Sequence, residues 1–304
     1  MEIENKMSTK ALVYVAEAEK LKKGGLFRRP RFDEAYDKYI MAANCMKMEN
    51  DMVKTANLFE EAAICAIMDD NKYNAIHAYI EAGKCVSFDT KLMCKYYTKG
   101  IEICVELGKF GHAAKHHKEL AEAFEKINDF ENCVFHLEKS AYYYETENMK
   151  NNSNNCKEKI AHILAQNKDG LKRAISIFEE LGNDCLNDFK GTRKYFAKKF
   201  FFKAGICYLC FDAHETIDLK IALEKYCRKD YTFNSQREYK LLISVIDAID
   251  NSDISSFSKC VAEYNGISPM ENWDVEMFLI IKRSLQQKYD VQKVSIIEDA
   301  DDLL

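Results

Sequence analysis

The amino-acid sequence predicts an all-α protein built from stacked pairs of helices, and three observations support this fold class. Its 304 residues include only 2 Pro and 11 Gly, whereas average usage is about 5% Pro and 7% Gly. Because β-rich and doubly wound α/β folds need frequent Pro-rich or Gly-rich turns, the scarcity of both favours long helices. Hydrophobic residues make up 47% of the chain, which excludes global disorder. The third observation is an internal repeat.

Small and aromatic residues recur at intervals of 39 or 40 positions. Ala35, Ala75 and Ala114 are spaced in this way, and Tyr39 and Tyr79 follow the same interval. A period near 40 fits two helices of about 15 to 17 residues joined by two short turns. The alanines mark positions where neighbouring helix backbones approach closely. The repeat therefore predicts a tetratricopeptide-like α-α solenoid.

Capping residues indicate where its helices begin and end. Four Asp residues precede helical patterns, where a carboxylate can accept hydrogen bonds from free amides: Asp33, Asp70, Asp129 and Asp169. Four Gly residues suit helix C-termini, where φ is often positive: Gly83, Gly100, Gly108 and Gly182. The polar stretch 148–155 is predicted to be a connection.

Helical character continues after about residue 195, but the period becomes irregular. Four helical patterns follow one another there, with a connection at Ser268-Pro269: 200–211, 217–226, 235–249 and 273–287. We therefore expect two domains. Residues 1–194 form the repeat array, including a loop at about 22–32, and residues 195–304 form a C-terminal helical bundle with an acidic tail.

Charge is distributed unevenly along a chain whose net charge is only −5. Residues 1–31 hold eight bases and four acids, and residues 193–203 hold five bases and no acid. Acids outnumber bases from residue 212 onward, and the last seven residues hold four acids and no base. This polarity predicts different partners for different parts of the chain, although charges also simply solvate helix faces.

The cysteine count and the apolar runs predict a cytoplasmic protein. Twelve Cys in 304 residues is far from the density of small disulfide scaffolds, and no secretory signal pattern precedes Ala11. The longest apolar stretch, residues 200–211, is interrupted by Lys203 and is shorter than the roughly 20 residues of a membrane span. A reducing cytosol is the expected setting.

No motif assembles an enzyme site. Gly-rich phosphate loops of the G-x-x-x-x-G-K-[ST] or G-x-G-x-x-G type do not occur in the sequence. Cys207 and Cys210 have redox or half-zinc spacing, but they lie in an apolar helical run and are predicted to be core residues. His112, His116 and His117 are predicted to line a surface or groove rather than a metal site. We expect no catalytic residue, no metal and no cofactor.

A binding scaffold and a nucleic-acid binder remain as function classes. The second would use residues 193–203, where lysines could meet phosphates and aromatic rings could stack on bases. On a helix, Phe196 and Phe200 fall on a side without lysine and are predicted to be core, which leaves Tyr195 and Phe202 among the lysines. The acidic chain as a whole favours the scaffold.

Three segments resemble one known family over residues 11–304. They are Gly108-Lys-Phe-Gly-His-Ala-Ala-Lys-His-His117, Lys194-Tyr-Phe-Ala-Lys-Lys-Phe-Phe-Phe-Lys-Ala204 with Cys207-Tyr-Leu-Cys-Phe-Asp212, and the terminal Asp-Asp-Leu-Leu. They are similar to the α-type soluble attachment proteins (SNAPs) for the N-ethylmaleimide-sensitive fusion ATPase. The resemblance implies a twisted helical sheet and a non-enzymatic adaptor in vesicle fusion and intracellular protein transport, including ER–Golgi transport.

The resemblance also implies partners and contact residues. Several copies, each monomeric when free, would surround one assembled SNARE four-helix bundle and recruit the ATPase that pulls it apart. The basic face would include Lys109, Lys115, Lys157, Lys159, Lys194, Lys198, Lys203 and Arg237. One family lysine is Asn155 here, and Lys157 would have to replace it from a position rotated by about 200°.

The remaining contacts implied by the resemblance lie at two other places. Carboxylates and terminal leucines would contact the ATPase: Asp212, Asp247, Asp250, Glu298, Asp299, Asp301, Asp302, Leu303 and Leu304. A further family acid is Asn251 here. The loop residues Leu26, Phe27, Arg28 and Arg29 would contact membrane lipids peripherally, with more dependence on anionic lipid than in the family, because Lys22-Lys23-Gly-Gly25 replaces paired phenylalanines.

Overall fold

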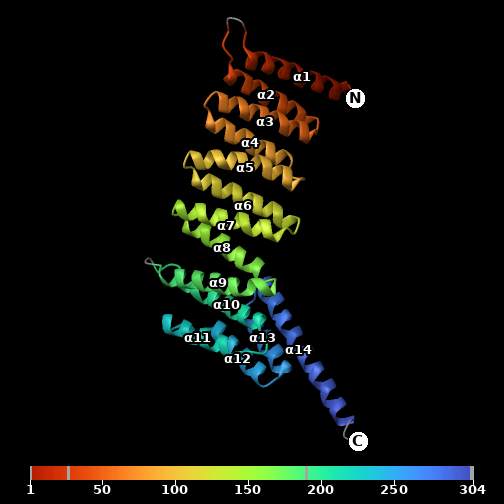
Figure 1. The fold of residues 1–304 in the computed structure, drawn as a ribbon. Coiled ribbons are helices and arrows are strands. Elements are labelled where there is room, and N and C mark those ends of the chain that lie inside the picture. Colours follow the sequence, from red (N-terminus) through yellow and green to blue (C-terminus); the bar gives the residue numbers. More distant parts are fainter. Residues whose placement is uncertain (1, 26–27, 189–190, 302–304) are drawn as a thin grey trace. The chain divides into compact units, whose positions relative to one another are not determined.

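The chain folds into helices throughout the parts that the structure describes. The computed structural model describes residues 2–25, 28–188 and 191–301, and the side chains of residues 9–25, 28–188 and 191–287. Every regular element in these ranges is a helix (Figure 1), apart from one isolated bridge between Gly25 and Arg28. The predicted all-α helical solenoid class is therefore confirmed.

The contacts divide the chain into two compact units, Met1–Cys156 and Lys157–Leu304. The division falls within α8 (Lys150–Leu164). The sequence places its domain boundary later, between residues 194 and 195, so the last turns of α8 and all of α9 lie here with the C-terminal unit. The functional division into repeat sheet and bundle stays a prediction.

The N-terminal unit is a row of helices in which each helix packs beside the next (Figure 1). The bounds are α1 Glu2–Lys23, α2 Phe32–Met48, α3 Met52–Met68, α4 Lys72–Cys85, α5 Thr90–Glu106, α6 Phe110–Lys126 and α7 Phe130–Thr146. Most of these helices are 17 residues long, which matches the length that the repeat predicts.

Short turns with a recurring residue chemistry connect the helices. Asp51, Asn71, Asp89 and Asp129 each accept a hydrogen bond from the backbone N–H three positions later, which caps α3, α4, α5 and α7. Asn50, Asp70 and Asn128 directly precede three of these caps and have positive φ, as do Gly108 and Asn148 in two other turns; Asn, Asp and Gly tolerate this conformation best.

Three of the four Asp residues predicted to cap helix N-termini lie at other positions. Asp129 is a cap as predicted, but Asp70 lies in the turn one residue before the cap, and Asp33 lies inside the first turn of α2. Asp169 belongs to the short 3-10 helix Lys168–Gly170 that leads into α9. Asp33 still favours the positive end of its helix, because it is an acid in the first turn.

Small residues allow the helices of the solenoid to pack closely. Ala35, Ala75 and Ala114 are fully buried, as predicted from their spacing. Gly108 ends its helix with a φ of 65°, but Gly83, Gly100 and Gly182 lie inside helices, where the prediction of helix C-termini is wrong. A Cβ atom on Gly83 would lie 2.4 Å from the Tyr97 ring. This glycine is needed for interhelical contact, not for backbone freedom.

The C-terminal unit is a helical bundle around an aromatic core. Its helices are α9 Leu171–Leu186, α10 Ala197–Phe211, α11 Ile217–Lys229, α12 Arg237–Asp250, α13 Ile254–Ile267 and α14 Asn272–Asp301, with short 3-10 helices at Lys168–Gly170, Lys194–Phe196 and Phe233–Ser235. The Phe201 ring stacks on Tyr226 with centroids 4.4 Å apart, and α10 packs against α9, α11, α12 and α14.

The helical patterns predicted after residue 195 correspond to α10, α11, α12 and α14, and the connection at Ser268 is confirmed because Ser268 is the C-cap of α13. Helix α13 itself was not predicted. The predicted connection at 148–155 is largely wrong. Only residues 148 and 149 lie outside a helix, and α8 begins at Lys150, where exposed polar side chains solvate its first turns.

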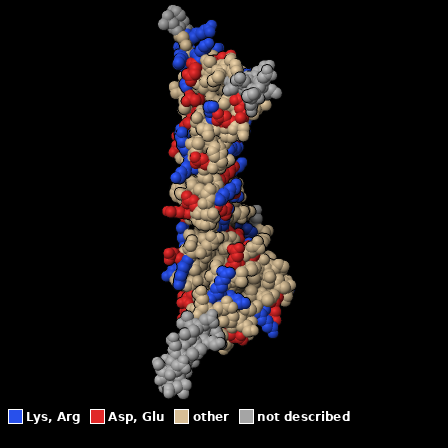
Figure 2. Space-filling view, turned by 90° about the vertical axis from the view of Figure 1, so that its right-hand side faces the viewer, with Lys and Arg blue, Asp and Glu red and all other residues tan. Residues whose placement is uncertain are grey.

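Charged side chains of both signs are interspersed on the face in Figure 2. Some ion pairs join different helices: Lys72 of α4 lies 3.1 Å from Glu106 of α5, and Lys99 of α5 lies 2.6 Å from Glu60 of α3. Among the described residues, no helix is both long enough and apolar enough to cross a membrane.

Candidate interaction surfaces

The predicted basic contacts on α6 are exposed. Lys109 is the N-cap residue of this helix, and its side chain makes no capping hydrogen bond. The Lys115 side chain is 66% exposed, and its Nζ lies 3.9 Å from Oε1 of Glu119. Because such exposed pairs contribute little to stability, both ammonium groups are accessible to an anionic partner.

A groove of about 390 Å³ lies beside Lys109, between α4 and α6. Its apolar lining includes Tyr73, Ile76 and Ile80, and its cationic lining includes Lys84 and Lys109. Such a lining suits a partner helix with an apolar stripe and acidic flanks. No sequence pattern predicts this groove, because it forms only when α4 and α6 come together across α5.

On α8, Lys157 does not take the place of Asn155. Asn155 is exposed, whereas Lys157 is half-buried and donates from Nζ to Oε1 of Glu180 at 2.7 Å. The two positions point in different directions, as the helical rotation between them requires. Lys159 is half-buried as well. The basic contribution of α8 to a binding face is therefore weaker than its lysine content indicates.

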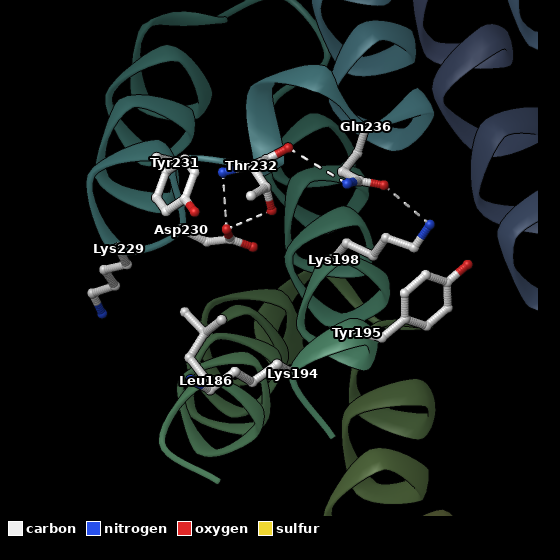
Figure 3. A pocket seen from close by; sticks show the side chains of 9 residues that line it. All are labelled: Leu186, Lys194, Tyr195, Lys198, Lys229, Asp230, Tyr231, Thr232 and Gln236. Atoms are coloured by element: carbon white, nitrogen blue, oxygen red, sulfur yellow. Dashed lines mark hydrogen bonds between the residues drawn. The ribbon is translucent and has the colours of Figure 1, made fainter. Parts of the chain in front are cut away.

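Lys194 and Lys198 line a pocket of about 370 Å³ at the start of α10 (Figure 3). Lys198 is only 19% exposed, and its Nζ lies 3.1 Å from Oε1 of Glu238 and 4.5 Å from the centroid of the Tyr195 ring. In Figure 3, the Lys198 ammonium points toward Gln236, away from Lys229. The lysines of this pocket therefore do not converge on one point.

Aromatic residues around this pocket differ from prediction. Tyr195 is 71% exposed and Phe196 is exposed beside it, whereas Phe202 is buried. The prediction that Phe196 lies in the core and Phe202 lies among the lysines is wrong, because the short 3-10 helix Lys194–Phe196 precedes α10 and changes the rotation of the side chains. Phe200 is buried as predicted.

Lys203 cannot be a surface contact, and its prediction as one is wrong. The residue is 1% exposed, and its Nζ lies 3.0 Å from Glu271 Oε2 and 3.0 Å from Asp274 Oδ1. Its ammonium also lies 4.6 Å from the centroid of the Trp273 ring. By contrast, Arg237 is exposed, and its Nη1 donates to Ser268 Oγ at 3.1 Å.

The predicted acidic contacts fall at the ends of helices. Asp212 and Asp247 are exposed, and Asp212 is the C-cap of α10. Asp250 accepts hydrogen bonds from Lys220 Nζ at 2.6 Å and Thr216 Oγ1 at 2.7 Å, and the bonds from these groups lower the pKa of its carboxyl. Of the predicted tail residues, Asp302, Leu303 and Leu304 lie outside the described residues, and the side chains of Glu298, Asp299 and Asp301 are outside the described part.

The predicted lipid-contact loop connects α1 and α2. Its Leu26 and Phe27 lie outside the described residues, whereas Arg28 and Arg29 are exposed. The backbone N–H of Gly25 donates to the carbonyl oxygen of Arg28 at 2.9 Å, and the reverse bond is 3.1 Å long. These two bonds join the two sides of the loop at Gly25 and Arg28.

One cluster of side chains in the described part has the spacing of a metal site. Ligand atoms of Glu158, His162 and Glu271 lie within 4.8 Å of one another. The Lys199 ammonium lies 2.9 Å from both carboxylates, so a cation of the protein itself is already bound there.

The other candidate metal ligands are the cysteines of the Cys207–Cys210 pair. Burial raises the pKa of Cys210 to about 12, which keeps this thiol protonated and a poor metal ligand.

A histidine pair, half-buried His117 and buried His136, lies between α6 and α7. Nδ1 of His117 lies 2.9 Å from Nδ1 of His136, and Tyr143 and Phe124 stack on the two rings. Burial lowers the pKa of His117 to about 3 and that of His136 to about 4. Of the three histidines predicted to line a surface or groove, His112 and His116 line the groove beside Lys109, whereas His117 is half-buried and lies outside that lining.

Comparison with known proteins supports the assignment suggested by the resemblance. A family model described as "Soluble NSF attachment protein, SNAP" matches residues 9–286. The alpha-soluble NSF attachment protein of Mus musculus is 32% identical over 285 residues, which cover 91% of this chain and 95% of that protein.

Two further relatives extend the match. The beta-soluble NSF attachment protein of Bos taurus is 33% identical and covers 91% of this chain and 94% of that protein. The vesicular-fusion protein SEC17 of Komagataella phaffii is 29% identical, with coverages of 86% and 88%. The family predicted from the sequence is thus confirmed: this chain belongs to the soluble NSF attachment protein (SNAP) family.

Proposed function

We propose that this chain is an adaptor that binds assembled SNARE four-helix bundles and recruits and stimulates the N-ethylmaleimide-sensitive fusion ATPase that disassembles them. Its membership of the SNAP family over residues 9–286 carries this proposal. The names of its relatives, which include a vesicular-fusion protein, agree with a role in vesicle-mediated protein transport. The chain itself would hold no catalytic residue and need no cofactor.

The SNARE bundle would contact the exposed cations of the predicted basic face. Lys109 and Lys115 on α6, Lys194 before α10 and Arg237 on α12 are exposed, and the groove beside Lys109 adds an apolar lining. Charge complementarity with an acidic bundle would speed association and make it salt-sensitive. Lys157, Lys159 and Lys198 would act more weakly, because they are half-buried. Lys203 is not part of this proposal.

The ATPase would contact the acidic residues toward the C-terminal end of the chain. Asp212, Asp247 and Asp250 offer exposed carboxylates, and residues 298–304 add four acids and two terminal leucines. Carboxylates suit basic grooves on the ATPase, and a leucine offers an apolar anchor. Several copies of the chain, monomeric when free, would surround one bundle.

Contact with membranes would be peripheral and would use the α1–α2 loop. Two exposed arginines, Arg28 and Arg29, follow its apolar residues in the sequence, and each base near an anionic surface contributes about 1 kcal/mol. The chain would thus be cytoplasmic and associate reversibly with membranes through Leu26, Phe27, Arg28 and Arg29.

A disassembly assay tests the proposal directly. An assembled SNARE bundle, the ATPase and ATP are mixed with the full chain, and release of the separated SNAREs is followed over time. We expect release to depend on the chain, and a chain lacking residues 301–304 to bind the bundle but support little release. A random oligonucleotide in the binding arm tests the nucleic-acid alternative. Release at the same rate without the chain would refute the proposal.

A further inference from the structure

An ionic cluster with a buried centre joins α8, α10 and α14 inside the C-terminal unit, where Lys203 and Asp274 are buried and Glu271 is exposed. At its centre is the Lys203 ammonium, which contacts Glu271 and Asp274 at 3.0 Å each. Lys199, one helical turn earlier on α10, bridges Glu271 and Glu158 of α8 at 2.9 Å each. Each of the two lysines thus binds two carboxylates, and Glu271 is shared by both.

The cluster is placed at the first turn of the longest helix. Glu271 and Asp274 flank the start of α14, and the backbone N–H of Glu271 donates to Oδ2 of Asp274 at 3.2 Å. Between them, Trp273 donates from Nε1 to the carbonyl oxygen of His162 at 3.3 Å, and its ring lies 4.8 Å from the His162 ring. The start of α14 therefore contacts α10 through ion pairs and α8 through an aromatic contact.

Burial of the Lys203–Asp274 pair restricts how α14 can be placed against α10. Lys203 is 1% exposed and Asp274 is 6% exposed, so neither charge can be solvated if the other moves away. Removing one partner of such a pair is strongly unfavourable, whereas an apolar replacement of both is often neutral for stability. A buried pair of this kind specifies geometry more than it adds stability, because only one placement of α14 keeps both charges paired.

The ends of the connected helices are the proposed binding regions. Lys198, in the first turn of α10, lies five positions before Lys203, which corresponds to about 7.5 Å along a helix. Helix α14 continues from the cluster toward the acidic residues of the tail. One buried cation thus connects the helix that begins at the proposed SNARE-binding region to the helix that leads to the proposed ATPase-binding tail.

We propose that Lys203 is a positioning residue: through Asp274 and Glu271 it fixes α14 relative to α10, so that force applied at the tail reaches the SNARE-binding region. This role rests on the proposed adaptor function. It differs from a SNARE contact, because the Lys203 side chain does not reach the surface. It also differs from a purely stabilising role, because the two make different predictions for an apolar replacement of the pair.

The experiment uses the full chain carrying Lys203→Met together with Asp274→Leu. We expect the thermal unfolding and the SNARE-bundle pull-down to match the wild type. The rate of ATPase-driven disassembly should fall by about fivefold or more, the scale of a lost coupling of about 1 kcal/mol. Amide hydrogen exchange in residues 275–287 should accelerate by about tenfold while α10 stays protected, since local opening of α14 becomes easier.

Two matched variants separate positioning from other effects. Lys203→Arg keeps the charge and should retain most of the disassembly rate. Lys72→Met with Glu106→Leu removes an exposed interhelical pair of similar length, 3.1 Å, and should change neither readout. If the Lys203/Asp274 double variant loses its cooperative unfolding, Asp274→Asn replaces it, because it removes one charge and keeps an oxygen acceptor.

The experiment distinguishes failure of the positioning role of Lys203 from failure of the adaptor proposal. Wild-type exchange and a wild-type disassembly rate in a folded double variant would overturn the positioning role. If the wild-type chain itself supports no disassembly, the adaptor proposal fails, but the exchange measurement needs no partner. Unchanged exchange in residues 275–287 would then still refute the claim that Lys203 holds α14.

Discussion

Nζ of Lys203 lies 3.0 Å from Oδ1 of Asp274, although 71 positions separate the two residues in the sequence. The lysine lies within an otherwise aromatic and aliphatic segment of α10, and the aspartate lies in the first turn of α14. The two charges therefore occupy the interior of the C-terminal unit and neutralise one another there. Around them, glycine and aromatic side chains set how closely the other helices approach.

Gly182→Ala is expected to destabilise the protein. A Cβ atom at this position would lie 2.5 Å from the ring of Phe201, which is fully buried and stacked on Tyr226. Because the ring cannot move without displacing its neighbours, we expect the free energy of unfolding to fall by about 1–3 kcal/mol, measured by chemical denaturation.

Gly266→Ala is the control for this prediction. Gly266 lies in α13, and a Cβ atom there would meet nothing within 4 Å. Alanine should leave stability unchanged or raise it by up to about 1 kcal/mol, because it is the better helix former. Equal effects of the two substitutions would contradict the steric reason given for Gly182.

The sequence alone predicted the architecture because the solenoid is a local and repeated structure. The alanine spacing and the Asp129 cap are visible within one repeat, and each describes contacts between neighbouring helices. The place of Lys203 depends on a partner in another helix far along the chain, so its charge alone suggested a surface position. Similarly, the sequence does not distinguish the interhelical contact of Gly182 from a helix end, because a close contact and a positive φ both favour glycine.

Acidification should destabilise the fold through His117 and His136. The pKa values of both imidazoles are lowered in the folded state, to about 3 and about 4, chiefly by burial. A lowered folded-state pKa means that the unfolded chain binds protons first. Stability is therefore complete above about pH 6.5, the ordinary His value, and is lost progressively as the pH falls toward 4.

Denaturation at pH 7 and pH 5 measures this effect. At pH 5 the lowered pKa of His117 should reduce the free energy of unfolding by about 2 kcal/mol, because 1.5 pH units separate pH 5 from the ordinary histidine pKa. His117→Gln removes one titrating ring and should reduce the loss between the two pH values by a similar amount. The same pH dependence in both proteins would show that the histidine pair does not account for it.

The α1–α2 loop should bind vesicles by charge and by one aromatic side chain. Phe27→Ser should reduce flotation with vesicles of phosphatidylcholine and phosphatidylserine, because it removes apolar area from the tip. Arg28→Ala should reduce flotation by about fivefold, which corresponds to about 1 kcal/mol for one base near an anionic surface.

Salt and lipid composition give the controls for the loop. Added salt or pure phosphatidylcholine should lower flotation of the wild type and erase the difference made by Arg28→Ala. If flotation is the same for the wild type and both variants, and does not respond to salt, membrane contact by this loop is ruled out.

Charge reversal on α6 should weaken SNARE binding without harming the fold. Lys109→Glu with Lys115→Glu changes two exposed ammonium groups; the Nζ of Lys115 lies 3.9 Å from Glu119. We expect pull-down of an assembled bundle to fall by at least about tenfold at physiological salt, because two attractive contacts become repulsive. The matched control is Lys139→Glu, an exposed lysine on α7 outside the predicted face. If the α6 variant and the control bind equally well, the basic face lies elsewhere, and Lys194 and Arg237 become the positions to reverse.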